Sequence, residues 1–295
     1  MAKRRAVLIS GASTGIGRQC AIDLAQRPAP YLVFAGVRDQ YEPFECANIV
    51  PLRLDITREE EIRHAKKQIA EALDQTRNNT PEPIGLYALI NNAGVAMGGP
   101  LEEIPLDTIR EQFEVNVFGQ IAMTQTFLPM LRQYASSDND DNASSHIINI
   151  GSIAGRSCLP FASPYSASKH ALKAFSDALR LELGQANIQV SLLEPGVIET
   201  PIWQKSLEKA SGDFRRVSDK TRADYGPKLE KLLSYLAQAP SRGVPASTVS
   251  RVVVHILESG RGIPRKLIGN DAILGSLFHM LPVSWTDYMI QKRLF

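Results

Sequence analysis

Short runs of apolar residues alternate with longer amphipathic segments along most of this chain. The apolar runs predict strands over residues 6–9, 31–37, 49–54, 86–91, 146–150, 189–193 and 266–268. Amphipathic periodicity predicts helices over residues 15–26, 58–73, 106–134, 164–184 and 247–258. The run 86–90 is continuously apolar, which is typical of a strand covered on both faces. Strands that alternate with helices in this way predict an α/β fold built around a parallel sheet.

Two internal stretches interrupt the alternation. Residues 136–145 are polar and acidic and predict an exposed loop. Asp138 could open a calcium-binding loop, but Ala143 stands where such a loop needs Gly, and Asn149 where it needs Glu. Residues 197–243 follow a predicted strand end, where α/β sheets place ligands, and contain no strand-like run, so we expect a segment that closes over a substrate.

Large apolar residues in the segment 197–243 fit either a pocket lining or a helix packed on the core. They are Ile202, Trp203, Leu207, Phe214, Tyr225, Leu229, Leu232, Leu233 and Tyr235. The tail, about 270–295, carries Leu277, Phe278, Leu281, Trp285 and Tyr288 together with Lys292 and Arg293. This tail would cap the substrate, lie on a membrane surface, or pack in the core or at a subunit contact; we favour the last two.

The composition narrows the class of protein. Of the 295 residues, 44% are hydrophobic and 22% are charged, as in ordinary globular proteins. Thirty-three Lys and Arg against 31 Asp and Glu leave a net charge of +2, which argues against a nucleic-acid partner. Cys20, Cys46 and Cys158 form no CxxC pair, so they indicate neither a disulfide framework nor a zinc site.

The five histidines show no metal-binding spacing, and we expect no metal. No run of about 18 apolar residues is present, so we expect no membrane span. The basic and apolar residues at the start are too short a run for a signal peptide. These features predict a soluble cytoplasmic protein.

A glycine-rich loop follows the first predicted strand and precedes a helix. Its sequence is Ser10-Gly-Ala-Ser-Thr-Gly-Ile-Gly17. Glycine permits a tight turn and lets backbone N–H groups approach a pyrophosphate at a helix N-terminus. The spacing G-x-x-x-G-x-G is neither the usual dinucleotide fingerprint nor a P-loop, and alone it fits a plain turn equally well.

Taken with later motifs, this loop resembles the short-chain dehydrogenase/reductase family, and in particular its hydroxysteroid and retinol dehydrogenase branch. The motifs are, in order, the glycine loop, Asn91-Asn-Ala-Gly94, Asn116, Ser152, Tyr165-Ser-Ala-Ser-Lys169 and Pro195-Gly196. Ser10 replaces the family's Thr but keeps the hydroxyl, and the match covers about residues 6–200. The resemblance implies a single Rossmann-like domain over 1–295, a doubly wound parallel sheet with helices on both faces. It also implies a homo-oligomer, since the family commonly forms dimers and tetramers.

The resemblance implies a nicotinamide coenzyme, and the end of the second predicted strand bears on its identity. NAD sites place a carboxylate on the ribose 2′-OH, whereas NADP sites place a cation at the 2′-phosphate. In the family's register Val37 occupies the acidic position and Arg38 the next, which favours NADP(H). Asp39, 22 residues after Gly17, leaves NAD(H) as the alternative. The coenzyme contacts expected from the resemblance are Gly11, Ser13, Thr14, Gly15, Ile16, Gly17, Arg38, Asp55, Ile56, Asn92, Ala93, Gly94, Tyr165, Lys169, Pro195, Gly196, Ile198 and Thr200.

Within that set the resemblance assigns particular contacts. Asp55 would bond the adenine, the backbone of residues 92–94 would lie along the adenosine ribose, and Ile198 and Thr200 would meet the nicotinamide carboxamide.

The expected catalytic residues are Asn116, Ser152, Tyr165 and Lys169. Tyr165 and Lys169 are four apart on a predicted helix, so their side chains share a face. The resemblance makes Tyr165 the proton donor or acceptor, Ser152 the group that holds the substrate oxygen, Lys169 the ligand of the nicotinamide ribose, and Asn116 the anchor of a relay water. A free tyrosine has a pKa of about 10, and we expect the ammonium and the positive nicotinamide to lower it.

The expected function is hydride transfer between NADP(H) and a secondary alcohol, ketone or aldehyde, and the expected partner is a hydrophobic small-molecule substrate. A catalytically silent scaffold that senses the coenzyme is the alternative, against which the four intact catalytic positions argue. A related lyase or epimerase would carry a different glycine spacing. A hydrolase nucleophile elbow at Ser152 fails because Ile150 stands where G-x-S-x-G needs Gly.

Overall fold

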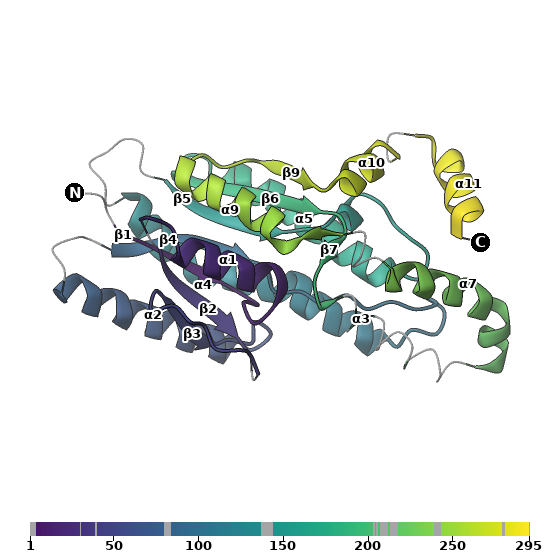
Figure 1. Ribbon diagram of the computed structural model, residues 1–295, viewed down its shortest axis with the longest axis horizontal. Helices are drawn as coiled ribbons and strands as arrows, with labels where there is room; N and C mark the ends of the chain where they lie inside the picture. Colours follow the sequence, from purple (N-terminus) through teal and green to yellow (C-terminus); the bar gives the residue numbers. More distant parts are fainter. Residues whose placement is uncertain are drawn as a thin grey trace.

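A parallel sheet forms the centre of the protein, seen in a computed structural model that describes residues 4–29, 31–38, 40–79, 84–136, 144–202, 204, 206, 212, 218–238, 243–278 and 281–294. Within these residues the central sheet has seven strands: β1 (Arg4–Ile9), β2 (Leu32–Val37), β3 (Ile49–Arg53), β4 (Ile84–Asn91), β5 (Ser145–Ile150), β6 (Ile188–Pro195) and β9 (Arg265–Ile268). Their order is β3-β2-β1-β4-β5-β6-β9, and every neighbouring pair is parallel (Figure 1). The predicted strands and the parallel arrangement are confirmed.

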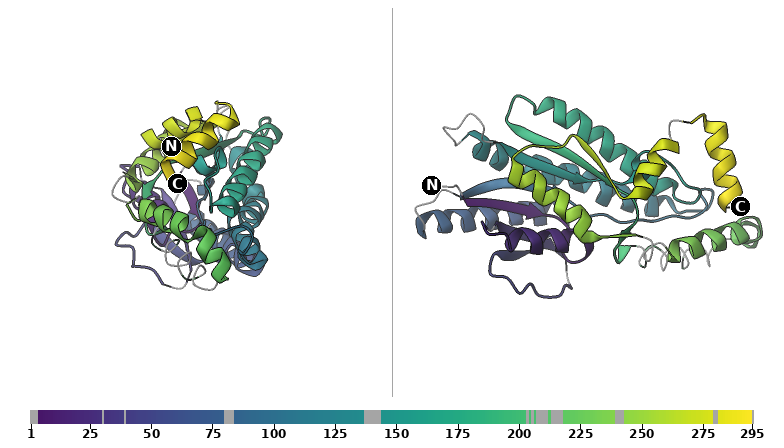
Figure 2. Two further views of the ribbon diagram at one scale, coloured as in Figure 1. Left: turned by 90° about the vertical axis from the view of Figure 1, so that its right-hand side faces the viewer. Right: turned by 45° about the horizontal axis from the view of Figure 1, so that its top comes forward.

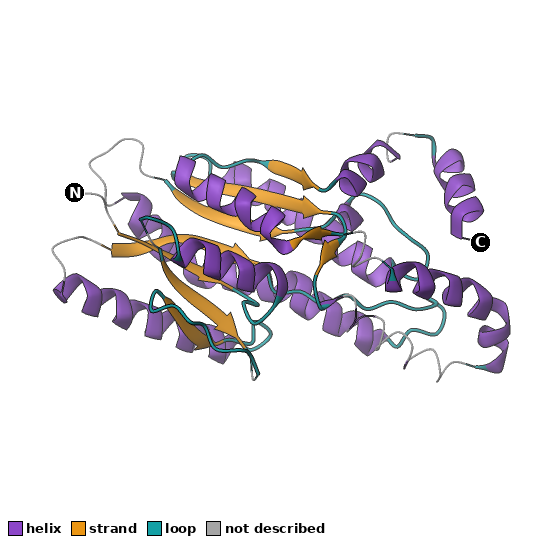
Figure 3. Ribbon diagram, in the orientation of Figure 1, coloured by secondary structure: helices purple, strands orange, loops and turns teal. Residues whose placement is uncertain are grey.

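Helices cover both faces of this sheet, which makes the fold doubly wound (Figure 3). One face packs against α1 (Gly15–Ala25) and α9 (Ala246–Ser259). The other packs against α2 (Glu59–Asn79), α4 (Gly119–Ser136) and α5 (Ser163–Glu182). Alternate residues of a strand face opposite sides, so Val7 and Ile9 of β1 join one cluster, and Ala6 and Leu8 join the other.

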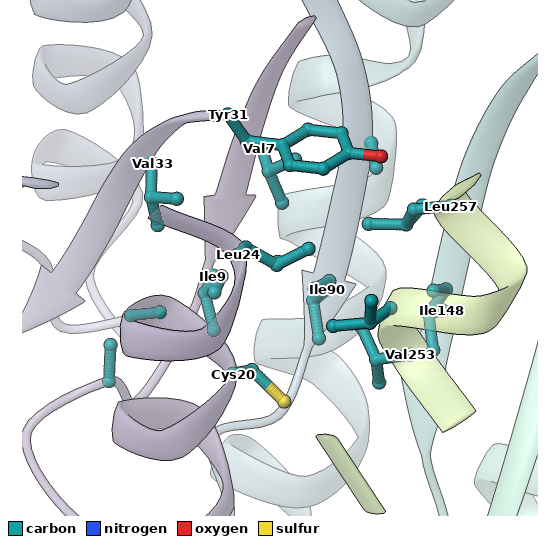
Figure 4. Close-up of a cluster of buried hydrophobic side chains, with 14 of the residues drawn as sticks. Val7, Ile9, Cys20, Leu24, Tyr31, Val33, Ile90, Ile148, Val253 and Leu257 are labelled. Atoms are coloured by element: carbon teal, nitrogen blue, oxygen red, sulfur yellow. The ribbon is translucent and has the colours of Figure 1, made fainter. Parts of the chain in front are cut away.

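The cluster under α1 and α9 is drawn in Figure 4, where Leu24 and Val253 approach Ile9 and Ile90 of the sheet. Because the strands are buried on both faces, their sequences are continuously apolar, which explains why the apolar runs located them well. The single-domain α/β prediction is confirmed.

The predicted helix over 106–134 has an internal irregularity. It consists of α3 (Leu106–Phe113), a π-helical turn η1 (Glu114–Phe118), and α4. A π turn contains more residues than an α turn, and such turns often occur at functional sites. Periodicity did not reveal it, because one wide turn barely changes the spacing of apolar positions.

Several elements lie beyond the carboxyl ends of the strands. They include the 3₁₀ turn η2 (Ile153–Gly155), which follows β5. They also include the helices α7 (Asp219–Ala237), α10 (Asn270–Phe278) and α11 (Val283–Leu294) (Figures 1 and 2). Two short strands, β7 (Ile198–Glu199) and β8 (Val244–Pro245), pair in parallel. The prediction of no strand within 197–243 was therefore wrong at β7, since two residues are too few to show a period.

The structure distinguishes between the interpretations that the sequence left open for the segment 197–243 and for the tail. Leu229 and Leu232 of α7 are buried, as a packed helix requires, whereas Ile202 faces the cavity described below. Trp203, Leu207 and Phe214, and the acidic run 138–142, lie outside the described residues. In the tail, Leu277, Phe278, Leu281, Trp285 and Tyr288 are exposed, so packing of these side chains in the chain's own core was wrong. Among the described residues, no helix is both long and apolar enough to cross a bilayer.

Candidate active site

A cavity of about 370 Å³ lies at the carboxyl ends of the strands, where α/β sheets bind ligands. The expected site residues that line it are Gly11, Ser13, Thr14, Gly15, Ile16, Arg38, Asp55, Ile56, Asn92, Ala93, Gly94, Ser152, Tyr165, Lys169, Pro195, Gly196, Ile198 and Thr200. They come from segments that follow six different strands. The parallel sheet thus brings together residues that are up to 189 positions apart in the chain, from Gly11 to Thr200.

The glycine loop is held close to the segment after β4. A Cβ on Gly11, which has φ +66°, would lie 2.8 Å from the Ala93 Cα. The Ser10 hydroxyl accepts hydrogen bonds from the Asn92 and Ala93 amides, at 3.0 and 3.1 Å. The Ser10 hydroxyl therefore has a structural task that the family's Thr would perform equally well.

Gly17 is the one expected coenzyme-contact residue that does not line the cavity. Its added Cβ would lie 2.4 Å from the Gly11 carbonyl and from the Asn92 side-chain nitrogen. The Asn92 side chain donates from Nδ2 to the Ser10 and Gly11 carbonyls, at 3.0 and 2.9 Å. Gly17 thus leaves room for the loop to fold back, a packing role that spacing alone does not separate from ligand contact.

The N-terminus of α1 opens toward the cavity. Thr14, the N-cap residue, makes no side-chain capping hydrogen bond, and the first turn carries no acidic residue. The N–H groups at a helix start are thereby left for an anion, and the helix dipole favours negative charge there. The residues present fit the pyrophosphate of a dinucleotide.

Arg38 and Asp55 both line the cavity. The Asp55 Oδ1 accepts hydrogen bonds from the Thr57 amide and hydroxyl, at 2.9 and 2.7 Å. Burial raises the pKa of Asp55, but the bonds from Thr57 and the nearby Arg38 and Arg58 outweigh it, so the pKa lies below its usual value. Asp55 is therefore an ionised acceptor beside a cation. Asp39, the residue that would favour NAD, lies outside the described residues.

Ser152, Tyr165 and Lys169 lie together at the cavity. Ser152 follows β5 and begins η2, where its hydroxyl accepts from the Ala154 amide at 3.1 Å. Tyr165 and Lys169 occupy successive turns of α5, with the Lys169 Nζ 5.9 Å from the centre of the Tyr165 ring. The Lys169 Nζ donates to the Ile150 carbonyl at 3.0 Å, and the lysine is 5% exposed.

Burial moves both titratable groups toward their neutral forms. It lowers the pKa of Lys169 to about 8. Burial also raises the pKa of the Tyr165 phenol above its ordinary value, although a hydrogen bond with Ser152 acts in the opposite direction. The lowered tyrosine pKa expected from the sequence is thus not a property of the chain alone.

Asn116 is buried in the π-helical turn η1 and does not line the cavity. Its Oδ1 accepts from the Val95 amide at 2.9 Å, and its Nδ2 donates to the Val95 carbonyl at 2.8 Å and the Ser168 hydroxyl at 3.0 Å. Gly94 lies between Asn116 and Lys169: its added Cβ would be 3.3 Å from Asn116 Oδ1 and 3.7 Å from Lys169 Nζ. Asn116 therefore joins the cavity wall to the helix that carries Tyr165 and Lys169.

The loop after β6 is fixed from two sides. The Gly196 amide donates to the Ile268 carbonyl at 2.9 Å, and the Val197 amide donates to the Asp271 carboxylate at 2.6 Å. Directly before this loop, Glu194 is 1% exposed and accepts a bidentate pair from Arg156, at 2.8 Å through Arg156 Nε. The ion pair ties the segment after Ser152 to the end of β6.

Sequence reasoning missed a second group of lining residues. They are Gly36, Leu54, Val95, Ala96, Met97, Glu111, Val115, Ile150, Gly151, Pro201 and Ser206, whereas Ile202 was already a candidate pocket residue. Most are chain neighbours of expected residues. Glu111 and Val115 lie on the same irregular helix as Asn116, and no motif in the sequence marks them as lining residues.

Comparison with known proteins identifies the family. The sequence profile of the short chain dehydrogenase family matches residues 5–211. The chain is 33% identical to the uncharacterized oxidoreductase YusZ of Bacillus subtilis (strain 168), over 99% of both chains. It is 30% identical to the mitochondrial D-beta-hydroxybutyrate dehydrogenase of Rattus norvegicus, over 87% of this chain and 74% of that one. It is 31% identical to retinol dehydrogenase 8 of Bos taurus, over 87% and 79% respectively.

Solved structures share the fold. A short chain dehydrogenase from Burkholderia cenocepacia J2315 in complex with NADP gives a TM-score of 0.68 at 22% identity, over 99% of this chain and 98% of that one. A short chain dehydrogenase/reductase from Burkholderia phymatum in complex with NAD gives 0.70 at 22% identity, over 99% and 97%. The profile match, the relatives and the shared architecture lead to one conclusion: this chain is an oxidoreductase-type member of the short-chain dehydrogenase/reductase family.

Proposed function

We propose that this protein transfers a hydride between NADP(H) and a secondary alcohol or the corresponding ketone or aldehyde. The observation that carries the proposal is the lining of one cavity by the glycine loop at one part and by Ser152, Tyr165 and Lys169 at another. The coenzyme supplies the hydride and, when oxidised, a positive ring. The residues of the chain bind and orient the coenzyme and the substrate, and they move a proton.

The proton step belongs to Tyr165. In reduction its hydroxyl donates a proton to the carbonyl oxygen of the substrate, and in oxidation its phenolate accepts the proton of the alcohol. Ser152 holds the same oxygen with its hydroxyl. A positive charge next to the phenol is needed to offset the burial that raises its pKa.

Lys169 supports this step through position and charge. Its side chain is ordered by the bond to the Ile150 carbonyl and has further N–H donors for ribose hydroxyls. With a pKa of about 8, Lys169 exchanges its proton near neutral pH, as a relay to solvent requires. Because both Nδ2 hydrogens of Asn116 are already donated, we assign the relay water to main-chain atoms that Asn116 positions.

The preference for NADP(H) rests on Arg38. Its guanidinium lines the cavity near Asp55 and matches a phosphate in charge and geometry. Relatives do not decide the matter, since one structural neighbour holds NADP and another NAD. Titration of the protein with NADPH and with NADH tests it: tighter binding of NADPH supports the assignment, and equal or weaker binding overturns it.

An apolar substrate is supported by apolar side chains that line the cavity or are exposed beyond the same edge of the sheet. Met97 and Ile202 line the cavity, and α10 and α11, which lie beyond the same edge of the sheet, expose Leu274, Leu277 and Trp285. Each buried CH₂ contributes about 0.8 kcal/mol, so kcat/KM should rise about fourfold per methylene along a ketone series. A small hydroxy acid preferred over all long-chain ketones would contradict this part of the proposal.

The decisive assay follows absorbance of NADPH and NADH during incubation with a panel of ketones and aldehydes. Oxidation of NADPH that depends on the carbonyl compound supports the proposed function. Tight coenzyme binding without turnover on any compound would instead favour the coenzyme-sensing scaffold.

We also infer a cytoplasmic homo-oligomer. The three cysteines are free, as in a reducing compartment, and Phe175 and Leu181 on α5 and Phe118 of η1 expose apolar surface that a second copy would cover. Light scattering of the purified protein and fractionation of cells test these two statements.

A further inference from the structure

Three buried amide side chains hold the wall of the cavity from behind. Gln120 donates from Nε2 to the Ala93 carbonyl at 2.9 Å, and Asn116 bonds both main-chain groups of Val95. Gln112 accepts at Oε1 from the Met97 amide at 2.6 Å. Each of the three is at most 1% exposed. We call Gln112, Asn116 and Gln120 the amide ladder.

The spacing of the amide ladder follows from helix and strand geometry. Its members are four residues apart, a rise of about 6 Å along a helix. The main-chain groups that they hold are two residues apart, which span about 6.6 Å in an extended chain. Four residues exceed one α turn by about 0.4 residue, and the wider π turn η1 takes up that excess. All three rungs therefore stay on one face of the helix.

The two ends of the ladder hold different parts of the cavity. Ala93 packs against Gly11 of the glycine loop, so the Gln120 rung supports the coenzyme part. Met97 leads into Gly98 and Gly99, and the Gly99 amide donates to the Phe161 carbonyl at 2.8 Å. Phe161 precedes α5 and lies edge-on to Tyr225 of α7, with ring centres 5.9 Å apart. The Gln112 rung thus supports the Met97 end of the cavity wall, which continues into the segment bonded to the residues just before α5.

We propose that Gln112 positions the substrate wall through Met97, and that Gln120 separately positions the coenzyme wall through Ala93. The proposal rests on the proposed function for the meaning of these two walls. Asn116 between them belongs to the site already described.

Unpaired amide atoms support this assignment. Among the described residues, Nε2 of Gln112 and Oε1 of Gln120 are buried without a hydrogen-bond partner. An apolar side chain of similar size would fill the same space without burying an unpaired polar atom. Each glutamine therefore keeps a buried amide in the helix for the single bond that it makes to the cavity wall.

The two glutamines use opposite ends of their amides, which gives a matched pair of variants. Glu retains an acceptor but, when ionised, has no donor. Gln112→Glu therefore keeps the bond to the Met97 amide, whereas Gln120→Glu loses the bond to the Ala93 carbonyl. Both variants introduce the same charge on the same helix, so a general effect of a buried carboxylate would be common to them. Gln112→Met and Gln120→Met remove both bonds without adding charge.

Three measurements test the division, each repeated from about pH 6 to about pH 10 because burial raises the pKa of a Glu at these positions. They are the coenzyme Kd by titration, KM and kcat for a ketone substrate, and hydrogen exchange of the Met97 amide. We expect Gln112→Met to raise KM about tenfold and to speed exchange at Met97, with the coenzyme Kd within about twofold of wild type. Gln112→Glu should restore KM and slow exchange.

For Gln120 the expected effects fall on the coenzyme. Gln120→Met should raise the coenzyme Kd about tenfold at every pH, and Gln120→Glu should do so once its carboxyl is ionised, since the neutral acid can still donate to the Ala93 carbonyl; both should leave exchange at Met97 unchanged. Equal effects of all variants on Kd and KM, or normal KM and exchange in Gln112→Met, would overturn the inference. If the wild type turns over no carbonyl compound, the proposed function fails, and the Kd and exchange measurements still decide whether the ladder is divided.

Discussion

Acid sensitivity of the fold should be dominated by one histidine remote from the cavity. His146, at the start of β5, is fully buried, and neither ring nitrogen has a hydrogen-bond partner among the described residues. It lies edge-on to Tyr87, with ring centres 5.0 Å apart, and Arg5 lies 4.6 Å from the same tyrosine ring. Burial, with a smaller contribution from Arg5, lowers the pKa of His146 from 6.5 to about 4.

The sign and size of the effect follow from linkage. Since the folded pKa is depressed, the unfolded chain takes up the proton first, and stability present above pH 6.5 is lost as the pH falls toward 4. The 2.5-unit difference corresponds to about 3 kcal/mol in full, of which about 2 kcal/mol is lost by pH 5. His146→Leu fills much of the space and carries no titrating group, so it should not lose this portion.

Urea unfolding at pH 7.5 and pH 5, followed by circular dichroism, measures the difference. The wild type should lose about 2 kcal/mol more than His146→Leu between these values. His255→Gln, on the exposed side of α9, serves as the control and should behave as wild type. If His146→Leu and wild type lose equal stability, then His146 is either hydrated or partnered, and the reasoning fails.

Three further predictions concern the site. Tyr165→Phe should lower kcat/KM by about 10² to 10⁴, with the NADPH Kd within about threefold of wild type, and retained turnover in kinetic assays would contradict the assignment. Arg38→Gln should raise the NADPH Kd about tenfold or more and leave NADH binding unchanged in the same titration. Arg156→Met should lower the free energy of unfolding by about 3–5 kcal/mol, because it leaves Glu194 buried without its cation. The double variant Arg156→Met with Glu194→Met should recover most of that loss in urea unfolding; a double variant as unstable as the single one would refute this account.

Much of the fold was predictable because its strands are covered on both faces. The run 86–90 is apolar at every position, and the structure buries the whole of β4. Short or irregular elements were not predictable in this way. The strands β7 and β8 have two residues each, and the π turn η1 hides within a regular-looking helix. Pairing and packing with distant residues stabilise these elements, and that information is absent from local periodicity.

The candidate site, too, was predictable from the sequence only in part. Glycine spacing located the loop after β1, but only the close approach of Asn92 and Gly11 gives Gly17 its packing role. Chain order placed Tyr165 and Lys169 on one helix face, but burial determines which protonation states they favour, opposite for the tyrosine to the expectation from charge alone. The amide ladder was not predicted, since its hydrogen bonds join side chains to main-chain groups about 15 to 27 residues away.

By itself, the sequence determined the order of strands and helices and the chemical groups that each strand end delivers. Local spacing is enough for this, because helices and strands impose periods of 3.6 and 2 on their apolar positions. Only the tertiary structure decided that those strand ends meet around one cavity and that Lys169, Glu194 and His146 lose contact with water. Proximity and desolvation depend on contacts between segments far apart in the chain, and for Lys169 they lower the pKa on which the proposed proton relay depends.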